Sequence, residues 1–220
     1  MPKRFDEDLS RLKQGLLMMG ALAEGMVRKT FSALADRRRE LVREVLEVED
    51  RLDAFQREID AETVRLISVY TPVAEDLRVL LMITRINAEL ERIGDQAVTV
   101  CRTYQDLALL EQPPLKPLED LSRMAAVAED MLHKGLRAFL DGSVEESMAV
   151  IEADNEGDQL NDRIFHELLT FIVRDRSTTG PALGLILTAR GFERIADHAV
   201  NIAEDVVYIV RGQDIRHTAK

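Results

Sequence analysis

Apolar residues recur along most of the chain at alternating steps of three and four. The first such series comprises Leu9, Leu12, Leu16, Met19, Ala23, Met26, Thr30 and Ala33. Two further series comprise Leu41, Val45, Val48, Leu52, Phe55 and Ile59, and then Ile86, Leu90, Ile93, Ala97 and Val100. This spacing is typical of long helices with one buried face. Because no run alternates between apolar and polar residues, the sequence predicts an all-α fold without strands.

Turn residues divide the chain into six predicted helices. We expect them at about residues 5–36, 40–70, 71–109, 118–140, 143–174 and 180–211. Thr71 is predicted to cap the third helix, with Pro72 at its first helical position. Half of the six prolines lie in residues 111–117, which is the clearest linker. We therefore predict a three-helix bundle at 1–112, a linker at 113–117 and a second three-helix bundle at 118–220, with antiparallel neighbours.

The two predicted bundles repeat each other in sequence. Val45, Glu47, Asp53 and Ile59 match residues of the same types 105 positions later. Residues 91–98 read Glu-Arg-Ile-Gly-Asp-Gln-Ala-Val, and residues 193–200 read Glu-Arg-Ile-Ala-Asp-His-Ala-Val. Buried seams restrict the residue types at apolar positions, but they do not explain a shared polar octet. The sequence therefore indicates two similar bundles related by duplication.

Each half contains two pairs of carboxylates spaced four residues apart. Residues at this spacing share one helix face, with Cβ atoms about 5–6 Å apart. Two carboxylates that close raise each other's pKa unless a cation neutralises them. Oxygen ligands at this density suit Mg²⁺, Mn²⁺, Ca²⁺ or iron. The candidate metal ligands are Glu49, Asp53, Glu91, Asp95, Asp154, Asp158, Glu193 and Asp197.

A simpler interpretation of these pairs stays open. The chain has 40 acidic residues, so a pair four apart often arises by chance on a solvated surface. Neighbouring Arg51, Arg92 and Arg194 can neutralise the acids as weak surface ion pairs. The recurrence of the carboxylate pairs at equivalent places in both halves is an argument for a metal site. The residues alone therefore favour neither a metal site nor a solvated surface.

Composition excludes several other classes of protein. The formal net charge of −11 argues against sequence-independent binding to nucleic acid. The single cysteine, Cys101, excludes an internal disulfide framework, and no stretch is long and apolar enough for a membrane helix. The first residues lack a signal-peptide pattern. We therefore expect a cytoplasmic protein without membrane insertion.

The repeated motif resembles the signature of the PhoU family. The resemblance rests on residues 91–95 and 193–204, on Pro72 to Arg78 and on residues 207–217, and it covers essentially the whole chain. It implies a PhoU-like fold of two homologous three-helix bundles and a non-catalytic regulator of phosphate transport. It also implies iron or zinc clusters at the eight carboxylates given above. Ala196 departs from the family, which usually has glycine there, as at Gly94.

The resemblance implies two partners and a function. The partners are the nucleotide-binding subunit of a phosphate ABC transporter and a membrane sensor histidine kinase, both restrained when phosphate is plentiful. We also expect a homodimer. One alternative is a metal-free helical adaptor for another transporter. Another is a di-iron carboxylate oxidase, which the sequence disfavours because none of the four histidines has a glutamate three residues before it.

Overall fold

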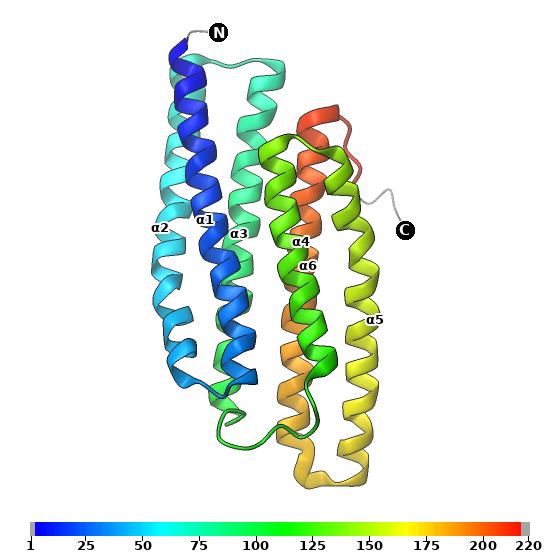
Figure 1. Cartoon of the computed structure of the whole chain (residues 1–220). Helices are drawn as coiled ribbons and strands as arrows, with labels where there is room; N and C mark the ends of the chain where they lie inside the picture. The colour runs from blue at the N-terminus through cyan, green and yellow to red at the C-terminus, as the bar shows by residue number, and fades with distance from the viewer. Residues whose placement is uncertain (1–2, 217–220) are drawn as a thin grey trace.

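The protein folds into six long α-helices, as seen in a computed structural model that describes residues 3–216 (Figure 1). Over this part of the chain there is no strand, which confirms the predicted all-α class. His217, which closes one of the resembling segments, lies outside the described residues. The elements are α1 (Lys3–Ala35), α2 (Arg39–Tyr70), α3 (Ala74–Asp106), α4 (Glu119–Asp141), α5 (Val144–Arg174), the 3₁₀ turn η1 (Arg176–Thr178) and α6 (Thr179–Arg211).

The predicted start of α3 is wrong by about three residues. Thr71 does not cap α3 but ends α2 in the left-handed conformation, with its N–H bonded to the Ile67 carbonyl at 3.0 Å. Pro72 follows this turn, and Val73 is the residue that precedes α3. The other predicted boundary that moves is the end of α3, which lies at Asp106 rather than near residue 109.

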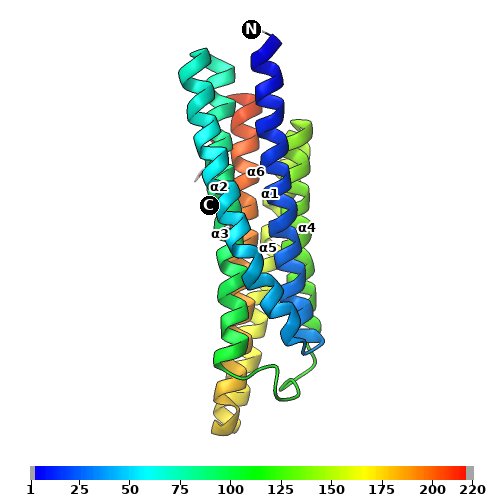
Figure 2. The ribbon, with the colours of Figure 1, turned by 90° about the vertical axis from the view of Figure 1, so that its left-hand side faces the viewer.

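The two halves lie side by side and share one hydrophobic core (Figures 1 and 2). Helices α1 to α3 form one half and α4 to α6 the other. Between the halves, α3 packs against α6 and α1 packs against α4. The structure has no helix, over its described residues, that is long and apolar enough to cross a membrane.

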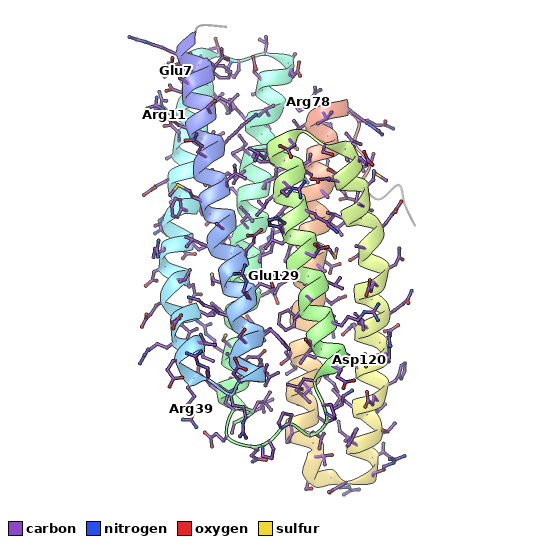
Figure 3. The ribbon with its side chains drawn as sticks, in the orientation of Figure 1. Glu7, Arg11, Arg39, Arg78, Asp120 and Glu129 are labelled. Carbon is purple, nitrogen blue, oxygen red and sulfur yellow. The ribbon has the colours of Figure 1, made fainter. Side chains whose placement is uncertain are left out.

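Contacts between α1 and α4 follow the internal duplication. The Arg28 Nε donates to a Glu129 carboxylate oxygen at 2.7 Å, and Glu24 lies 3.1 Å from the His133 Nδ1 (Figure 3 labels Glu129). Glu24 and Arg28 correspond to Glu129 and His133 at the offset of 105. The glutamate of each half thus contacts the basic residue of the other half. The halves therefore meet about a pseudo-twofold axis, as two copies do in a symmetric dimer.

Small residues allow α3 and α6 to approach closely. Gly191 of α6 lies directly against Val100 of α3, and a Cβ atom on Gly191 would overlap the Val100 Cγ2. Gly184 of α6 is packed as closely by Leu109, which lies in the connection just after α3. Since both glycines lie inside a helix, where glycine is less favourable than alanine, their presence is explained by this close packing.

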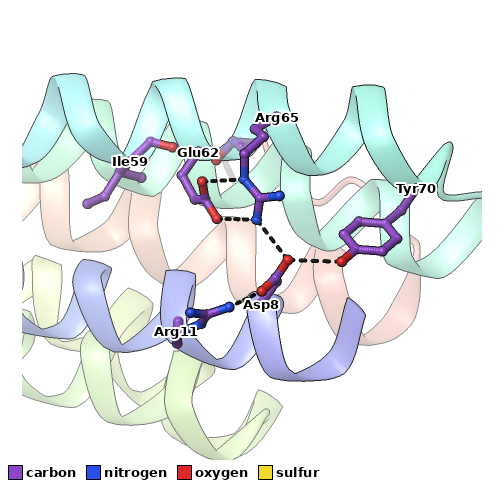
Figure 4. Close-up of polar contacts among 7 residues, drawn as sticks. Asp8, Arg11, Ile59, Glu62, Arg65 and Tyr70 are labelled. Atoms are coloured by element: carbon purple, nitrogen blue, oxygen red, sulfur yellow. Dashed lines mark hydrogen bonds and ion pairs between the residues drawn. The ribbon is translucent and has the colours of Figure 1, made fainter. Parts of the chain in front are cut away.

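A polar cluster joins the start of α1 to the end of α2 (Figure 4). Asp8 is buried and accepts hydrogen bonds from Arg65 at 2.7 Å, from the Tyr70 hydroxyl at 3.0 Å and from Arg11. Hydrogen bonds from Arg65 and Tyr70 lower the pKa of Asp8 to about 2. The cluster lines an open groove of about 810 Å³ between α1 and α2, which also contains Glu58.

Close packing at Gly191 predicts a specific double-mutant result. Gly191→Ala should destabilise the protein by about 1–2 kcal/mol, because overpacking outweighs the better helix propensity of alanine. Val100 is β-branched and has little rotamer freedom to move aside. Adding Val100→Ala should remove most of the Gly191→Ala penalty in urea unfolding. As a control, Gly25→Ala meets no atom within 4 Å and should not destabilise. Additive effects at residues 100 and 191 would contradict this account of the interface.

The Asp8 cluster predicts a dependence of stability on acid. Because the folded-state pKa of Asp8 is depressed, its contribution is complete above the unfolded value near 3.8 and is lost as pH falls towards about 2. Asp8→Asn should lower the melting temperature at pH 7 and flatten its fall below pH 4. Glu58→Gln, in the same groove, is the control. Equal acid dependence in wild type and Asp8→Asn would show that the cluster does not hold these helix ends together.

Candidate functional site: two carboxylate quartets

The structure brings together the four predicted acids of the first half. Glu49 and Asp53 lie on α2, and Glu91 and Asp95 lie on the adjacent α3. Burial, followed by repulsion from Asp95 and Asp53, raises the pKa of Glu91. Burial also raises the pKa of Glu49, which feels Asp95 across the groove between the helices. We call these four residues the first quartet.

The second half repeats this arrangement with a stronger effect. Asp154 and Asp158 lie on α5, and Glu193 and Asp197 lie on α6. Burial, then repulsion from Asp158 and Asp197, raises the pKa of Asp154 to about 6. Burial and the neighbouring acids also raise the pKa values of Glu193 and Asp197. These four residues form the second quartet, in which burial and repulsion between acids have the larger effect on pKa.

The arginines expected to neutralise the quartets are only partly engaged with them. Arg92 pairs with Glu89 at 3.1 Å, and Glu89 lies two residues before Glu91 and outside the first quartet. Instead, Arg102 approaches Glu49, with 3.7 Å between nitrogen and oxygen, and it lowers the pKa of that acid against the effect of burial. Arg190 and Arg194 act on Glu193 only at longer range. Net repulsion therefore persists in both quartets.

The donor chemistry of the quartets fits a hard cation, but their side chains do not converge. All eight ligating groups are carboxylates, which are the ligands preferred by Mg²⁺, Mn²⁺, Ca²⁺ and iron. Among residues 3–216, however, no three acidic, histidine or cysteine side chains are grouped so that they can hold a metal ion. The quartets therefore bring candidate ligands to one groove without enclosing a site.

Ala196 occupies the position that corresponds to Gly94 in the first half. This position lies in the core and not among the carboxylates. Gly94 packs against Leu52, so closely that a Cβ atom would overlap the Leu52 side chain. Ala196 is likewise buried. Both positions are therefore buried, each within its own half of the core.

Sequence patterns missed a second polar group, which lies between the halves. Glu89 of α3 accepts a hydrogen bond from Asn201 of α6 at 3.0 Å and lies 2.7 Å from the His198 Nδ1. Burial opposes ionisation of Glu89, but these two contacts outweigh it and lower its pKa. The charge at Glu89 thus ties α3 to α6 beside the quartets. No spacing rule signals this contact, because its members lie more than 100 residues apart.

A buried acid near the end of α6 was also missed. Asp205 is almost completely buried, and burial raises its pKa to about 7 although Arg85 of α3 lies 3.3 Å away. Neither of its carboxylate oxygens accepts a hydrogen bond within the described residues. The sequence marks Asp205 only as an acid on the buried side of a helix.

The fold and the quartets define an internally duplicated six-helix protein with paired acids on adjacent helices. The PhoU domain family model matches twice, at residues 16–103 and 121–206. The phosphate-specific transport system accessory protein PhoU of Escherichia coli (strain K12) is 33% identical over 97% of this chain and 88% of its own length. The PhoU homologue of Pseudomonas aeruginosa is 34% identical over 98% of this chain and 88% of its own.

Solved structures agree with the sequence comparison. The crystal structure of PhoU from Pseudomonas aeruginosa has a TM-score of 0.91 at 32% identity, covering 95% of this chain and all of that chain. PhoU from Streptococcus pneumoniae, at 24% identity, supports the fold alone, with a TM-score of 0.86 over 96% of this chain and 98% of its own. The chain belongs to the PhoU family.

Repulsion in the second quartet predicts that stability falls as pH rises. Because the pKa of Asp154 is raised above its unfolded value of 3.8, the folded state binds more protons between about pH 4 and 6. In chelator-treated protein, stability should therefore decrease over this range and stay lowered above pH 6. Asp154→Asn should raise stability at pH 7 by about 0.5–1 kcal/mol, since solvent screens the half-exposed group. The measurement is urea unfolding from pH 4 to 8.

The control for this prediction is Asp162→Asn, an exposed acid on the same helix outside the quartet. If Asp154→Asn and Asp162→Asn change the pH profile equally, repulsion within the quartet has no special energetic weight.

Proposed function

We propose that this protein is an accessory regulator of phosphate-specific transport, which acts by contact with other proteins rather than by catalysis. The observation that carries the proposal is the full-length match to accessory proteins with that function, at about one-third identity. When phosphate is plentiful, the chain restrains the nucleotide-binding subunit of the phosphate ABC transporter. It also holds a sensor histidine kinase in its inhibitory state.

The shape of the molecule suits a contact role. Six helices of 23 to 33 residues form a long, rigid surface, and the shared core leaves no hinge between the halves. In the open groove at Asp8, Arg65 pairs with both Asp8 and Glu62. Groups arranged in this way hold helices together and are not free to act on a substrate.

We also propose that metal ions bind at the two quartets. A cation would relieve the repulsion that raises the pKa values of Asp154, Glu193 and Asp197. Small rotations of the half-exposed side chains would turn their oxygens toward one ion. Binding to the folded state alone stabilises it by about 2.7 kcal/mol when free metal is about 100-fold above its Kd. Iron or zinc is the metal proposed.

A metal-free adaptor is the second candidate. Two observations favour it: no three ligating side chains converge among residues 3–216, and Arg102 already approaches Glu49 at 3.7 Å. In this case nearby arginines and solvent compensate the charge of the acids. Such an adaptor acts through the same helical surfaces but responds to no metal.

Metal content separates these two candidates. The test compares wild type with a variant in which Glu91, Asp95, Glu193 and Asp197 are all alanine. We expect stoichiometric metal in the wild type by plasma mass spectrometry, its loss from the variant, and a lower melting temperature after chelation of the wild type alone. A matched variant replaces four exposed acids outside the quartets, at Glu47, Glu58, Glu152 and Asp162. Wild-type protein without metal even after loading would favour the adaptor.

Regulation is tested in cells of the source organism that lack this gene. Without it, phosphate uptake and phosphate-starvation genes should stay active in phosphate-rich medium, and the gene on a plasmid should restore repression. Unchanged uptake and gene expression after deletion would refute the regulatory function, whatever the metal content.

A further inference from the structure

One end of the α5–α6 hairpin extends beyond the rest of its half (Figures 1 and 2). Helix α4 has 23 residues, whereas its counterpart α1 has 33, so the first eleven residues of α1 have no equivalent in the second half. The connection between α3 and α4 takes the place of these eleven residues, but it covers only one side of the projecting end of the hairpin. There Lys116 pairs with Glu167, and Leu118 lies over Leu168.

The other side of this projecting end exposes large apolar side chains. Phe165, Leu169 and Val173 recur at steps of four and therefore share one face of α5. Leu183 and Leu187 do the same on α6, which packs directly against α5. These five residues, which we call the tip patch, have exposed fractions of 41–79%. Contiguous exposed apolar groups on a folded protein commonly mark an interaction site.

The internal duplication shows that the fold does not require the tip patch. At the corresponding positions the first half carries Asp60, Val64 and Ser68 on α2, and Leu81 and Arg85 on α3. Three of these five residues are polar or charged. The first half also exposes Val64, Val69, Val73 and Leu81 around this end, so the second half is distinguished by two rows in which every exposed residue is apolar.

The tip patch also differs in charge from the rest of the chain. Between residues 163 and 190 the basic residues are Arg163, Arg174, Arg176 and Arg190, and the acidic residues are Glu167 and Asp175. Both acids are engaged, since Glu167 pairs with Lys116 and Asp175 accepts from the Ser177 N–H at 2.9 Å. Arg163 pairs with Asp120, with 3.8 Å between nitrogen and oxygen, so Arg174, Arg176 and Arg190 give this end of a chain of net charge −11 a local positive excess beside the tip patch.

We propose that the tip patch is the docking site for an amphipathic helix of a partner protein, with acidic residues flanking its apolar face. Two rows of apolar side chains on adjacent helices can receive the apolar face of one further helix. The row from Phe165 to Val173 spans about 12 Å, or two turns of a docked helix. Arg190, three residues after Leu187, lies beside these rows to meet a carboxylate.

The structure favours this occupant over a membrane and over a second copy. Asp158 lies eleven residues before Leu169, three turns along the same face of α5, so the second quartet would repel an anionic bilayer. A second copy docked symmetrically at this end would place Arg174, Arg176 and Arg190 against the same basic residues of its partner. A partner helix can present acids at Arg190 alone and avoid the quartet.

The inference rests on the proposed function, because it assigns a surface to contact with a transport or signalling component. The test uses the purified nucleotide-binding subunit of the phosphate transporter and the cytoplasmic part of the sensor kinase. Binding is measured for wild type, for Leu169→Glu with Leu187→Glu, and for Arg190→Glu. Val64→Glu is the matched control, since Val64 is the exposed counterpart of Leu169 in the first half. Unchanged melting temperatures confirm that each variant folds.

We expect the two patch variants to raise Kd for one probe by at least about tenfold, with Val64→Glu unchanged. Binding should also weaken with added salt. Equal binding by all variants would overturn the proposal. So would patch-dependent binding only to vesicles of phosphatidylethanolamine and phosphatidylglycerol, or patch-dependent self-association in sedimentation. The wild type could restore phosphate control in cells that lack the gene and yet bind neither the transporter subunit nor the kinase fragment. That result would refute the docking site while the regulatory function stands.

Discussion

The close packing of α3 against α6 is the constraint on which the rest of the structure depends. Gly191 allows the two helices to approach closely, and Glu89 is held between them by His198 and Asn201. This contact joins the halves about a pseudo-twofold axis and merges their cores. It also places the second helix of each half, α2 or α5, on the outside, so that both quartets open to solvent at the edge of the molecule.

Carboxylate repulsion is the energetic consequence of this arrangement. The apolar seam fixes the rotation of each helix, and the acids one position beyond it must face the adjacent helix. Burial and like charge then raise the pKa values of Glu91 and Asp154, which lowers stability near neutral pH. A core that extends through both halves is large enough to offset this cost. Repulsion of this kind is relieved either by protonation of an acid or by a neighbouring positive charge.

Much of the fold could be predicted from the sequence because it is encoded locally. Steps of three and four between apolar residues mark helices, and the repeated octet marks the duplication. The same spacing placed all four acids of each half on facing helices, since helical periodicity and the hairpin order are enough to bring them together. The start of α3 was misplaced because Thr71 and Pro72 suit both the end of one helix and the start of the next, and only tertiary packing decides between them.

Contacts between distant segments could not be predicted in this way. The Asp8 cluster joins residues about 60 positions apart, and the Glu89 contacts join residues more than 100 apart. No local pattern distinguishes these acids from the many solvated ones. The tip patch was hidden for a related reason: its residues fit a helical pattern, and only the structure shows which of them stay exposed.

The central claim is that the fold forces like charges together in each half. It is tested most directly by carboxyl-carbon NMR titration of metal-free protein, with Asp154 assigned through Asp154→Asn. The account predicts a pKa near 6 for Asp154, together with raised values for Glu193 and Asp197, and a decrease in all three when a divalent cation is added. Ordinary pKa values that do not respond to cations would contradict it, and would reduce the quartets to solvated surface acids.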